Sequence, residues 1–359
     1  MKHHMNVSVN NKPVRMIHRA LLLIFMLFLM KPELHAQVIS KTGTTSGQFL
    51  HIPVGARATA LGGAVTASSL DATGLIWNPA GIAAVNNRQI MIEHSEWFAG
   101  IQHNFIGGVL PLGDAGDAGT VGLYVVALTM EDMEETTFEE QEGTGRYFGA
   151  GNYAVGASYA RYLMENFAIG GTVKYVYEKI WNTSAGGWAV DFGTHYVTPF
   201  DGMRFGVRIA NFGQKLNMEG DDLITTVDID PGSEGNNNRI DARLATDSFD
   251  LPLMLQVGLA YDLYETSFVR MTVLADAISP SDAQQSVNLG TELSFYEGLV
   301  SVQAGLPELF LGDDRMFRFA LGGGVRYQLN SGLDLDIGYA MNDHQYLGIT
   351  NRFSLKIGF

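Results

Sequence analysis

The sequence contains no cysteine among its 359 residues. Disulfide frameworks, thiolate metal sites and cysteine nucleophiles are therefore excluded. The absence of cysteine does not decide the cellular compartment, because an oxidising periplasm permits disulfides without requiring them. Basic residues are scarce too, since 23 Lys and Arg stand against 38 Asp and Glu, which gives a formal net charge of −15. A charge of that sign argues against nucleic acid as a partner.

Long apolar runs are missing as well, apart from one near the start of the chain. Residues 20–30 read ALLLIFMLFLM. A run of about 11 residues is too short to span a bilayer as a helix but fits the core of a secretory signal peptide. We expect residues 1–36 to be a signal peptide cleaved after Ala36, with Met16 as an alternative start of translation. A single uncleaved anchor is the competing interpretation.

Recognisable catalytic and metal-binding motifs are also lacking. The sequence has no G-x-S-x-G nucleophile turn and no H-E-x-x-H pair. His195 and Asp191 could share one strand face, which leaves a hydrolase as a minor alternative. The segment 228–238 is rich in oxygen ligands, but Pro231 and Gly232 break the spacing of an EF-hand calcium loop. We expect a protein that is not an enzyme and has no cofactor and no metal site.

What the sequence does contain is glycine, at 42 residues, and aromatic side chains, at 11%. This combination suits strands joined by tight turns. From about Arg88 to the end, short segments alternate apolar and other residues with a period of two, which predicts strands with two unlike faces. In the last segment Phe353 and Leu355 lie on one face, while Arg352 and Lys356 lie on the other.

A soluble sandwich would alternate in the same way, but three further features favour a membrane barrel. The polar face is rich in Gly, Ala and Ser, as in a crowded wet lumen. Aromatic residues cluster near strand ends, where interfacial girdles lie. The chain also ends on an apolar strand at Phe359, whose edge must be paired. We therefore predict an all-β fold, a 14-stranded antiparallel transmembrane outer-membrane β-barrel with a small N-terminal plug or hatch segment.

The alternating segments number about fourteen, an even count as single-chain bacterial barrels require. Their expected spans are 88–97, 101–111, 118–130, 147–161, 166–180, 185–198, 203–212, 252–264, 267–278, 285–296, 298–306, 315–329, 332–342 and 346–359. If the first strand runs outward, short connections fall on the periplasmic side and the long ones, 131–146 and 213–251, fall outside. This predicts an integral protein of the bacterial outer membrane, surrounded by its lipid, with both termini in the periplasm.

The block before the barrel comprises residues 37–87, and residues 47–87 of it do not alternate. Its small residues permit close backbone packing, and the pair Asn78-Pro79 favours a turn. We expect it to fold as a plug inside the barrel, residues 88–359, or as a periplasmic cap. A disordered leader is the alternative, which Leu75 and Trp77 oppose because such side chains need burial.

Three stretches of this block carry a resemblance to a known family. Residues 49–57 (FLHIPVGAR), 61–64 (LGGA) and 77–81 (WNPAG) resemble the opening of the PorV/PorQ outer-membrane proteins, which are similar in turn to FadL-type fatty-acid transporters. The resemblance implies a fourteen-stranded barrel. It also implies a hatch whose motif residues here are Arg57, Asn78, Pro79, Ala80 and Gly81.

The same resemblance implies two different functions. The first is association with type IX secretion, in which the outer loops bind secretion-system components or exported protein domains at the cell surface. The rival is a FadL-like passive channel for small hydrophobic molecules. The outward acidic run 131–142 could bind divalent cations or a basic partner, although such runs are more often solvated surface.

Candidate site residues follow from the parity of the alternation. The charges expected in the lumen are Glu93, Lys174, Glu178, Asp191, Arg208, Arg270, Asp276, Glu292, Arg318, Arg326, Asp334, Asp336, Arg352 and Lys356. They could line a cargo path, anchor the plug by salt bridges, or only solvate and brace the interior. Four other lumen positions are apolar, namely Tyr124, Val126, Leu128 and Met254. They suit either a hydrophobic substrate or packing against the plug.

Overall fold

The computed structural model describes residues 43–113, 116–230, 232, 239–312, 315–329 and 332–359. These residues belong to one compact unit, Ser40–Phe359, and a second unit, Met1–Ile39, lies outside the described residues, as does the expected signal peptide. None of the helices in the described part of the chain is long and apolar enough to cross a lipid bilayer.

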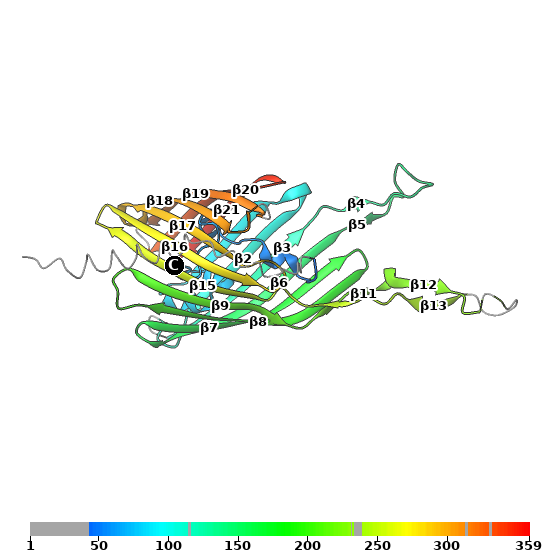
Figure 1. Ribbon diagram of the computed structural model, residues 1–359, viewed down its shortest axis with the longest axis horizontal. Coiled ribbons are helices and arrows are strands. Elements are labelled where there is room, and N and C mark those ends of the chain that lie inside the picture. Colours follow the sequence, from blue (N-terminus) through cyan, green and yellow to red (C-terminus); the bar gives the residue numbers. More distant parts are fainter. Residues whose placement is uncertain (1–42, 114–115, 231, 233–238, 313–314, 330–331) are drawn as a thin grey trace, which may run out of the picture. The chain divides into compact units, whose positions relative to one another are not determined.

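Fourteen strands of the described chain form one closed antiparallel ring, in which each strand pairs with the next along the sequence. The ring closes where the first strand pairs with the last, and Figure 1 labels most of its members. The strands are β1 (Gln89–Glu96), β2 (Gln102–Pro111), β3 (Thr120–Thr129), β6 (Ala150–Met164), β7 (Phe167–Ile180), β8 (Thr183–Val197), β9 (Met203–Gly213), β15 (Met254–Glu265), β16 (Val269–Pro280), β17 (Ser286–Phe295), β18 (Val300–Leu309), β19 (Phe317–Leu329), β20 (Leu333–His344) and β21 (Gly348–Gly358). The fourteen-stranded barrel predicted from alternation is confirmed.

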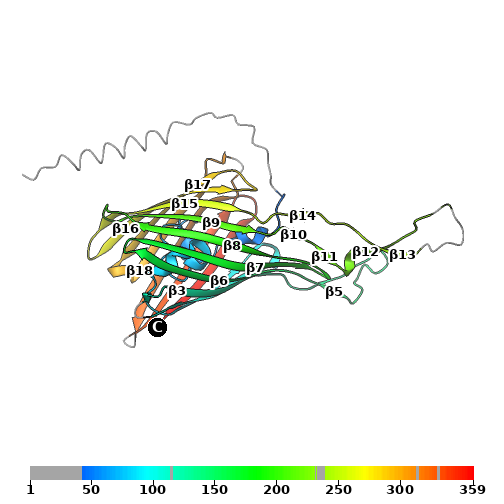
Figure 2. The same ribbon diagram turned by 90° about the horizontal axis from the view of Figure 1, so that it is seen from below.

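The two ends of the barrel carry different connections, as the sequence predicts. At the turn end, short segments such as 165–166 and 266–268 join the strands. At the hairpin end, the two longest connections form the small hairpins β4 (Met133–Glu134) with β5 (Tyr147–Phe148) and β12 (Ile224–Val227) with β13 (Ile240–Arg243). Both hairpins extend from the same end of the barrel in Figures 1 and 2.

The longer of these connections also contains four shorter elements. β10 (Leu216–Asn217) pairs with β14 (Ser248–Phe249), and β11 (Glu219–Gly220) extends the sheet beside β8. One turn of 3-10 helix, η5 (Asp221–Leu223), precedes β12. Two more such turns, η3 (Phe98–Gly100) and η6 (Tyr296–Gly298), lie in the β1–β2 and β17–β18 connections.

The wall of the barrel has an apolar outer face and a buried inner face. Leu123 is 67% exposed and its neighbour Tyr124 only 4%, and this alternation recurs along most strands. The outward side chains are large and apolar, for example Val155, Phe192 and Phe353. A closed ring with an outward face of this kind has the surface of a transmembrane barrel, because lipid takes the place of water there.

Residues 43–87, called the inner segment here, lie within the ring and are coloured blue in Figure 1. They form η1 (Gln48–His51), α2 (Ala56–Ala60), α3 (Gly74–Trp77) and η2 (Pro79–Ala84). Helix α2 packs against β18, β19, β20 and β21, whereas η2 packs against β3, β6, β7 and β8. Leu61, Leu75 and Ile82 are fully buried. The burial expected of this block's apolar residues is thus observed, and a disordered leader is not what residues 43–87 form.

Glycines in the wall let the inner segment approach the strands very closely. A Cβ on Gly305 would lie 2.2 Å from the amide nitrogen of Gly62, and one on Gly193 would lie 2.1 Å from Oδ1 of Asn78. A side chain at Gly305 would require the backbone to move, and one at Gly193 would displace the Asn78 side chain from its capping hydrogen bond with Ala80. The small residues of the inner segment therefore lie against glycines of the barrel wall.

The inner segment begins at the hairpin end. The amide of Ser46 donates to the carbonyl of Asp250, just before β15, whereas Phe359 pairs with Arg88 at the turn end. Gly43, the first described residue, and the carboxyl terminus thus lie toward opposite ends of the barrel. The N-terminal half of the expectation that both termini face the periplasm concerns residues outside the described part of the chain.

Candidate functional site

The site is the lumen, where charged wall residues meet the inner segment. Six of the predicted lumen charges bind inner-segment groups, and the others lie among wall residues. The six are Glu93, Glu178, Asp276, Glu292, Arg352 and Lys356. Each of these six contacts joins the barrel wall to the inner segment.

Arg57 of α2 and Glu292 of β17 form a two-pronged ion pair. Nε of Arg57 lies 2.6 Å from Oε2 of Glu292, and its terminal nitrogen lies 3.2 Å from Oε1. Another guanidinium nitrogen donates to the carbonyl of Ser68 at 3.4 Å. Burial alone would lower the pKa of Arg57, but the carboxylate of Glu292 outweighs it and raises that pKa. The planar fork of arginine fits a carboxylate in this way.

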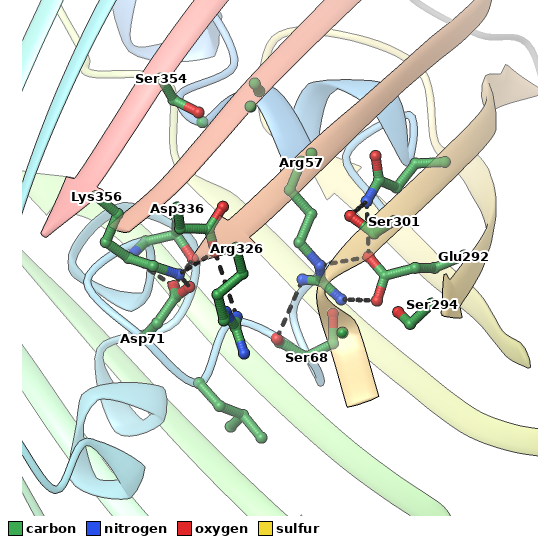
Figure 3. A pocket seen from close by; sticks show the side chains of 18 of the residues that line it. Arg57, Ser68, Asp71, Glu292, Ser294, Ser301, Arg326, Asp336, Ser354 and Lys356 are labelled. Atoms are coloured by element: carbon green, nitrogen blue, oxygen red, sulfur yellow. Dashed lines mark hydrogen bonds and ion pairs between the residues drawn. The ribbon is translucent and has the colours of Figure 1, made fainter. Parts of the chain in front are cut away.

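Lys356 of β21 forms the second anchor, shown beside the first in Figure 3. Its ammonium contacts the carboxylate of Asp71 in the inner segment and lies 3.3 Å from Asp336 of β20. Asp336 also lies 3.3 Å from the guanidinium of Arg326. Burial by itself would raise the pKa of Asp71, yet Lys356 and the hydrogen bonds from Thr73 hold it well below its ordinary value.

A third anchor is formed by Glu93 of β1 and Arg352 of β21, which lie side by side in the wall. Their side chains are 2.5 Å apart and buried. Glu93 accepts from the amide of Gly55, and Arg352 donates to the carbonyl of Pro53. An ion pair in so dry a place needs partners for its remaining donors and acceptors. The inner-segment backbone supplies two of them, while Nε of Arg352 has no partner among the described residues.

Three other carboxylates of the barrel bind the inner segment near its start, at residues 45–51, and at Thr66. Asp276 accepts from the amide of Thr66 at 2.9 Å, and Glu178 accepts from Gly47 at 3.0 Å. Asp282, in the β16–β17 connection, accepts from Thr45 at 2.6 Å, Gln48 at 2.8 Å and His51 at 3.3 Å. Burial would raise the pKa of Asp282, but these hydrogen bonds lower it.

Lys174, Asp191 and Arg208 form a buried polar cluster on β7, β8 and β9. Nζ of Lys174 lies 2.8 Å from Asp191 and 2.5 Å from Oδ1 of Asn211, while Arg208 donates to Gln256 at 3.1 Å. Asp191 is thus bound by Lys174 and the amide of Asn211. His195 forms no ion pair with it among the described residues, which gives the hydrolase alternative no geometric support.

The remaining predicted charges behave differently. Arg270 and Asp334 form no ion pair within the described part of the chain, although Arg270 lines a cavity. Arg318 lies at a β-bulge of β19, between Phe317 and Phe319. Its guanidinium lies 3.4 Å from Asp343 and its side chain is 53% exposed. Parity counting places a residue inside only where the ladder is regular, so it is not a reliable guide to Arg318.

The motif residues 78–81 begin η2. Asn78 is completely buried, and its Oδ1 accepts from the amide of Ala80 at 3.1 Å, which caps the helix. Its amide nitrogen donates to the carbonyls of Thr66 and Thr194. Pro79 takes the first helical position, where its missing N–H costs nothing. A Cβ on Gly81 would lie 1.9 Å from the carbonyl oxygen of Ser69.

Two cavities remain between the inner segment and the wall. The larger, the turn-end cavity, has a volume of about 290 Å³ and is lined by both Arg57 and Lys356. The smaller, of about 20 Å³, lies between apolar residues of the inner segment and of β3, beside the Lys174 cluster, and we call it the apolar pocket. It is lined by Phe49, Leu50, Ile52, Val54, Ile76, Tyr124, Val126, Lys174, Asp191, Arg208 and Asn211.

Some residues of the site could not be found from the sequence. Asp71 and Asp282 lie outside the strands, so no alternation marks them, and their partners are more than 200 residues away. Among the apolar lumen positions, Tyr124 and Val126 are buried against the inner segment, with Leu128 packed beside them. No group of three or more His, Asp or Glu in the described residues could hold a metal ion.

Comparison with known proteins supports the fold. The family model "Uncharacterised protein family (UPF0164)" matches residues 31–197. A search of curated proteins gave no match. A FadL homologue of Pseudomonas aeruginosa is 14% identical, with a TM-score of 0.51, over 86% of this chain and 98% of that one.

Two toluene transporters are similar to the same degree. TodX of Pseudomonas putida is 12% identical, with a TM-score of 0.52, over 85% of this chain and 96% of its own. TbuX of Ralstonia pickettii is 12% identical, with a TM-score of 0.51, over 85% and 97%. The PorV/PorQ part of the resemblance stays a prediction. This chain has the fold of the FadL-like barrels.

Proposed function

We propose that this protein is a passive outer-membrane channel for small hydrophobic molecules, with the inner segment as its movable plug. The observation that carries the proposal is the apolar contact between Phe49, Val54 and Ile76 of the inner segment and Tyr124 and Val126 of β3. An apolar lining in a lumen otherwise full of charges suits a hydrophobic solute. The toluene transporters of the same fold support this choice over the secretion role, and favour a protein without catalysis.

The channel must open by movement of the inner segment. The apolar pocket, at about 20 Å³, has room for about one water molecule. A monoaromatic molecule is several times larger, so Phe49 and its neighbours have to withdraw before one can pass. Leu61, Leu75 and Ile82 of the inner segment are fully buried, and Leu75 packs against the wall at Gly107 and Gly122. Opening must therefore break these contacts between the inner segment and the wall.

A disulfide lock tests this proposal, and the absence of cysteine makes the test clean. A Cβ on Gly338 would lie 3.1 Å from Cβ of Ala56 and 2.8 Å from Oγ of Ser354. Ala56→Cys with Gly338→Cys can therefore bridge the inner segment to β20 once the Ser354 side chain turns aside and the two Cβ atoms separate by about 0.7 Å, toward the usual distance of about 3.8 Å. Cells that display the oxidised variant should accumulate labelled toluene no faster than cells without the protein, and a reductant should restore uptake.

The matched control joins two wall strands instead. Ile90 and Gly108 are register partners of β1 and β2 on the outer face, so Ile90→Cys with Gly108→Cys leaves the inner segment free and should transport in both redox states. Equal uptake by the locked and reduced forms would contradict the plug. Absence of toluene uptake by the unaltered protein would contradict the channel itself for this class of solute.

A surface-attachment role of the PorV type is the second candidate. Its support is the β4–β5 hairpin, whose Phe138 is 99% exposed within the acidic run 131–142, since exposed aromatic residues on loops often anchor partners. Co-purification with exported carboxy-terminal domains, lost when residues 213–251 or 131–146 are exchanged, would favour it. Retention of toluene uptake in the same exchanges would assign the two roles to different parts of the chain.

A further inference from the structure

The turn-end cavity is polar and carries an excess of positive charge. It is lined by the cations Arg57, Arg204, Arg270, Arg326 and Lys356 against the three carboxylates Asp71, Glu292 and Asp336. The carboxylates are all paired, because Asp71 and Asp336 contact Lys356 and Glu292 contacts Arg57. A positive cavity in a chain of net charge −15 attracts anions rather than cations.

Arg270 is the cation left over. Arg204 pairs with Asp262 at 2.9 Å and Arg326 with Asp336 at 3.3 Å. The side chain of Arg270 makes no ion pair or hydrogen bond with a described residue, although its charge interacts with that of Glu292, and it lines the cavity. An arginine offers five donors in a flat fork that matches a carboxylate or phosphate. The donors of Arg270 are therefore available to a ligand.

The strand register extends Arg270 into a row of polar and small residues at one level of the wall. Consecutive strands from β16 to β21 contribute one residue each, and adjacent members are register partners about 4.8 Å apart. The row is Arg270, Ser294, Ser301, Gly324, Gly338 and Ser354. The two glycines remove side chains from its middle, and the three serines leave hydroxyl groups along it.

Two of these hydroxyl groups have no partner. Ser294 is only 6% exposed, and neither it nor Ser354 forms a side-chain hydrogen bond with any described residue. Ser301 accepts from Gln303 at 2.8 Å. Figure 3 places Ser294 beside the Arg57–Glu292 pair and Ser354 on the far side of the cavity. Neither hydroxyl oxygen is among the fully buried polar atoms without a partner, so both are accessible to water or to a ligand.

We propose that the turn-end cavity binds a small hydroxylated carboxylate, of the size of a sugar acid, with the carboxylate on Arg270 and the hydroxyl groups along the serine row. A volume of about 290 Å³ lies at the lower limit of ligand pockets, which suits a molecule of about a dozen heavy atoms. This site is separate from the apolar pocket and from the proposed passage of hydrophobic molecules.

Gluconate tests the proposal because it carries both a carboxylate and hydroxyl groups. Acetate has only the carboxylate and sorbitol only the hydroxyl groups, so these two compounds are the controls. Calorimetry on the mature protein in a non-ionic detergent should show saturable binding of gluconate at millimolar concentration. Acetate, which lacks the hydroxyl groups, and sorbitol, which lacks the charge, should each bind about tenfold more weakly, the size of effect expected for losing charge-assisted or paired hydrogen bonds. Equal binding of acetate and gluconate, or no binding of gluconate, overturns the proposal.

Variants separate a built site from general attraction. Arg270→Gln removes a side chain that no described residue depends on, and should weaken gluconate binding about tenfold. Arg318→Gln removes an arginine near the hairpin end and should leave binding unchanged. Ser294→Ala should weaken gluconate but not acetate. If Arg270→Gln and Arg318→Gln bind gluconate alike, the site is refuted, whereas toluene uptake by Arg270→Gln reports on the channel independently.

Discussion

Lys356, on the last strand of the barrel, forms an ion pair with Asp71 of the inner segment, 285 positions earlier in the chain. Three such anchors, at Lys356, Glu292 and the Glu93–Arg352 pair, hold the inner segment to strands β1, β17 and β21. Each joins a group of the inner segment to a group of the wall. The inner segment is therefore held by charge as well as by packing, and this makes its attachment sensitive to pH and to single substitutions.

Acid should loosen the inner segment through Asp71. Its pKa is depressed in the folded chain, so its contribution to stability is complete above the unfolded value of about 3.9 and is lost as the pH falls below that value toward the folded one. Quenching of Trp77 by acrylamide should therefore rise below about pH 4. Trp77 donates to the carbonyl of Val54 at 2.6 Å, which makes it a reporter of this packing.

Asp71→Asn should reduce the pH dependence and increase quenching at neutral pH. Asp241→Asn on β13 removes a carboxylate far from the inner segment and serves as the control. Trp77→Phe gives the background from the other tryptophans. An acid response as steep in Asp71→Asn as in the unaltered protein would assign the loosening to other carboxylates.

Arg57 should not be replaceable by lysine without loss. Arg57→Lys keeps the charge but can offer only a point contact in place of the two-pronged pair with Glu292. We expect Arg57→Lys to destabilise the packing of the inner segment by about 1 kcal/mol and Arg57→Ala by about 2 kcal/mol, because alanine leaves the carboxylate of Glu292 with only the hydrogen bond from Gln303. Thermal unfolding followed by Trp77 fluorescence measures both. Equal values for the two variants would mean that the fork geometry does not matter.

Gly305 should be intolerant of any side chain. A Cβ there would lie 2.2 Å from the backbone nitrogen of Gly62, so Gly305→Ala should displace the inner segment and cost about 1–3 kcal/mol by overpacking. Gly108→Ala is the matched control, since its Cβ would meet nothing nearer than 3.4 Å. Limited proteolysis within residues 43–87 should be faster in Gly305→Ala alone. Protection of both variants would contradict the close approach.

A charge on the outer face should prevent insertion into lipid. Leu123→Arg replaces a side chain that is 67% exposed in the middle of β3, and should cost about 2–4 kcal/mol on folding into vesicles. Phe138→Arg changes an even more exposed apolar residue, at 99%, but in the β4–β5 hairpin beyond the strands, where the cost should vanish. If the two variants fold equally well into lipid, the outward apolar face does not contact the bilayer.

The strands could be predicted because the alternation is a local property of the sequence. All fourteen begin and end within three residues of their expected spans, and the contrast of short and long connections fixed the two ends of the barrel. Parity does not fix the face of Arg318, because that residue lies at a bulge of the ladder. A bulge leaves no mark in the apolar pattern, since one extra residue shifts the faces without changing composition.

The sequence predicts that the inner segment is folded, but its position inside the barrel could not be predicted. Leu75 and Trp77 required burial, and they are buried, yet nothing local indicates that α2 packs on β18–β21 or that the segment starts at the hairpin end. Those facts depend on pairs such as Asp71 with Lys356 and Thr45 with Asp282. Residues more than 200 positions apart meet only because the barrel closes. The local sequence around each residue carries no information about such a partner.

The pairing of β1 with β21 has a consequence for biogenesis. β1 gains its second neighbour only when β21 pairs with it, so the ring stays open until the two strands farthest apart in the sequence meet. Sheet closure must therefore enclose a segment that is already present, and the chain's final residues complete the enclosure. A truncation of only a few carboxy-terminal residues would leave a gap beside the very strand that follows the inner segment.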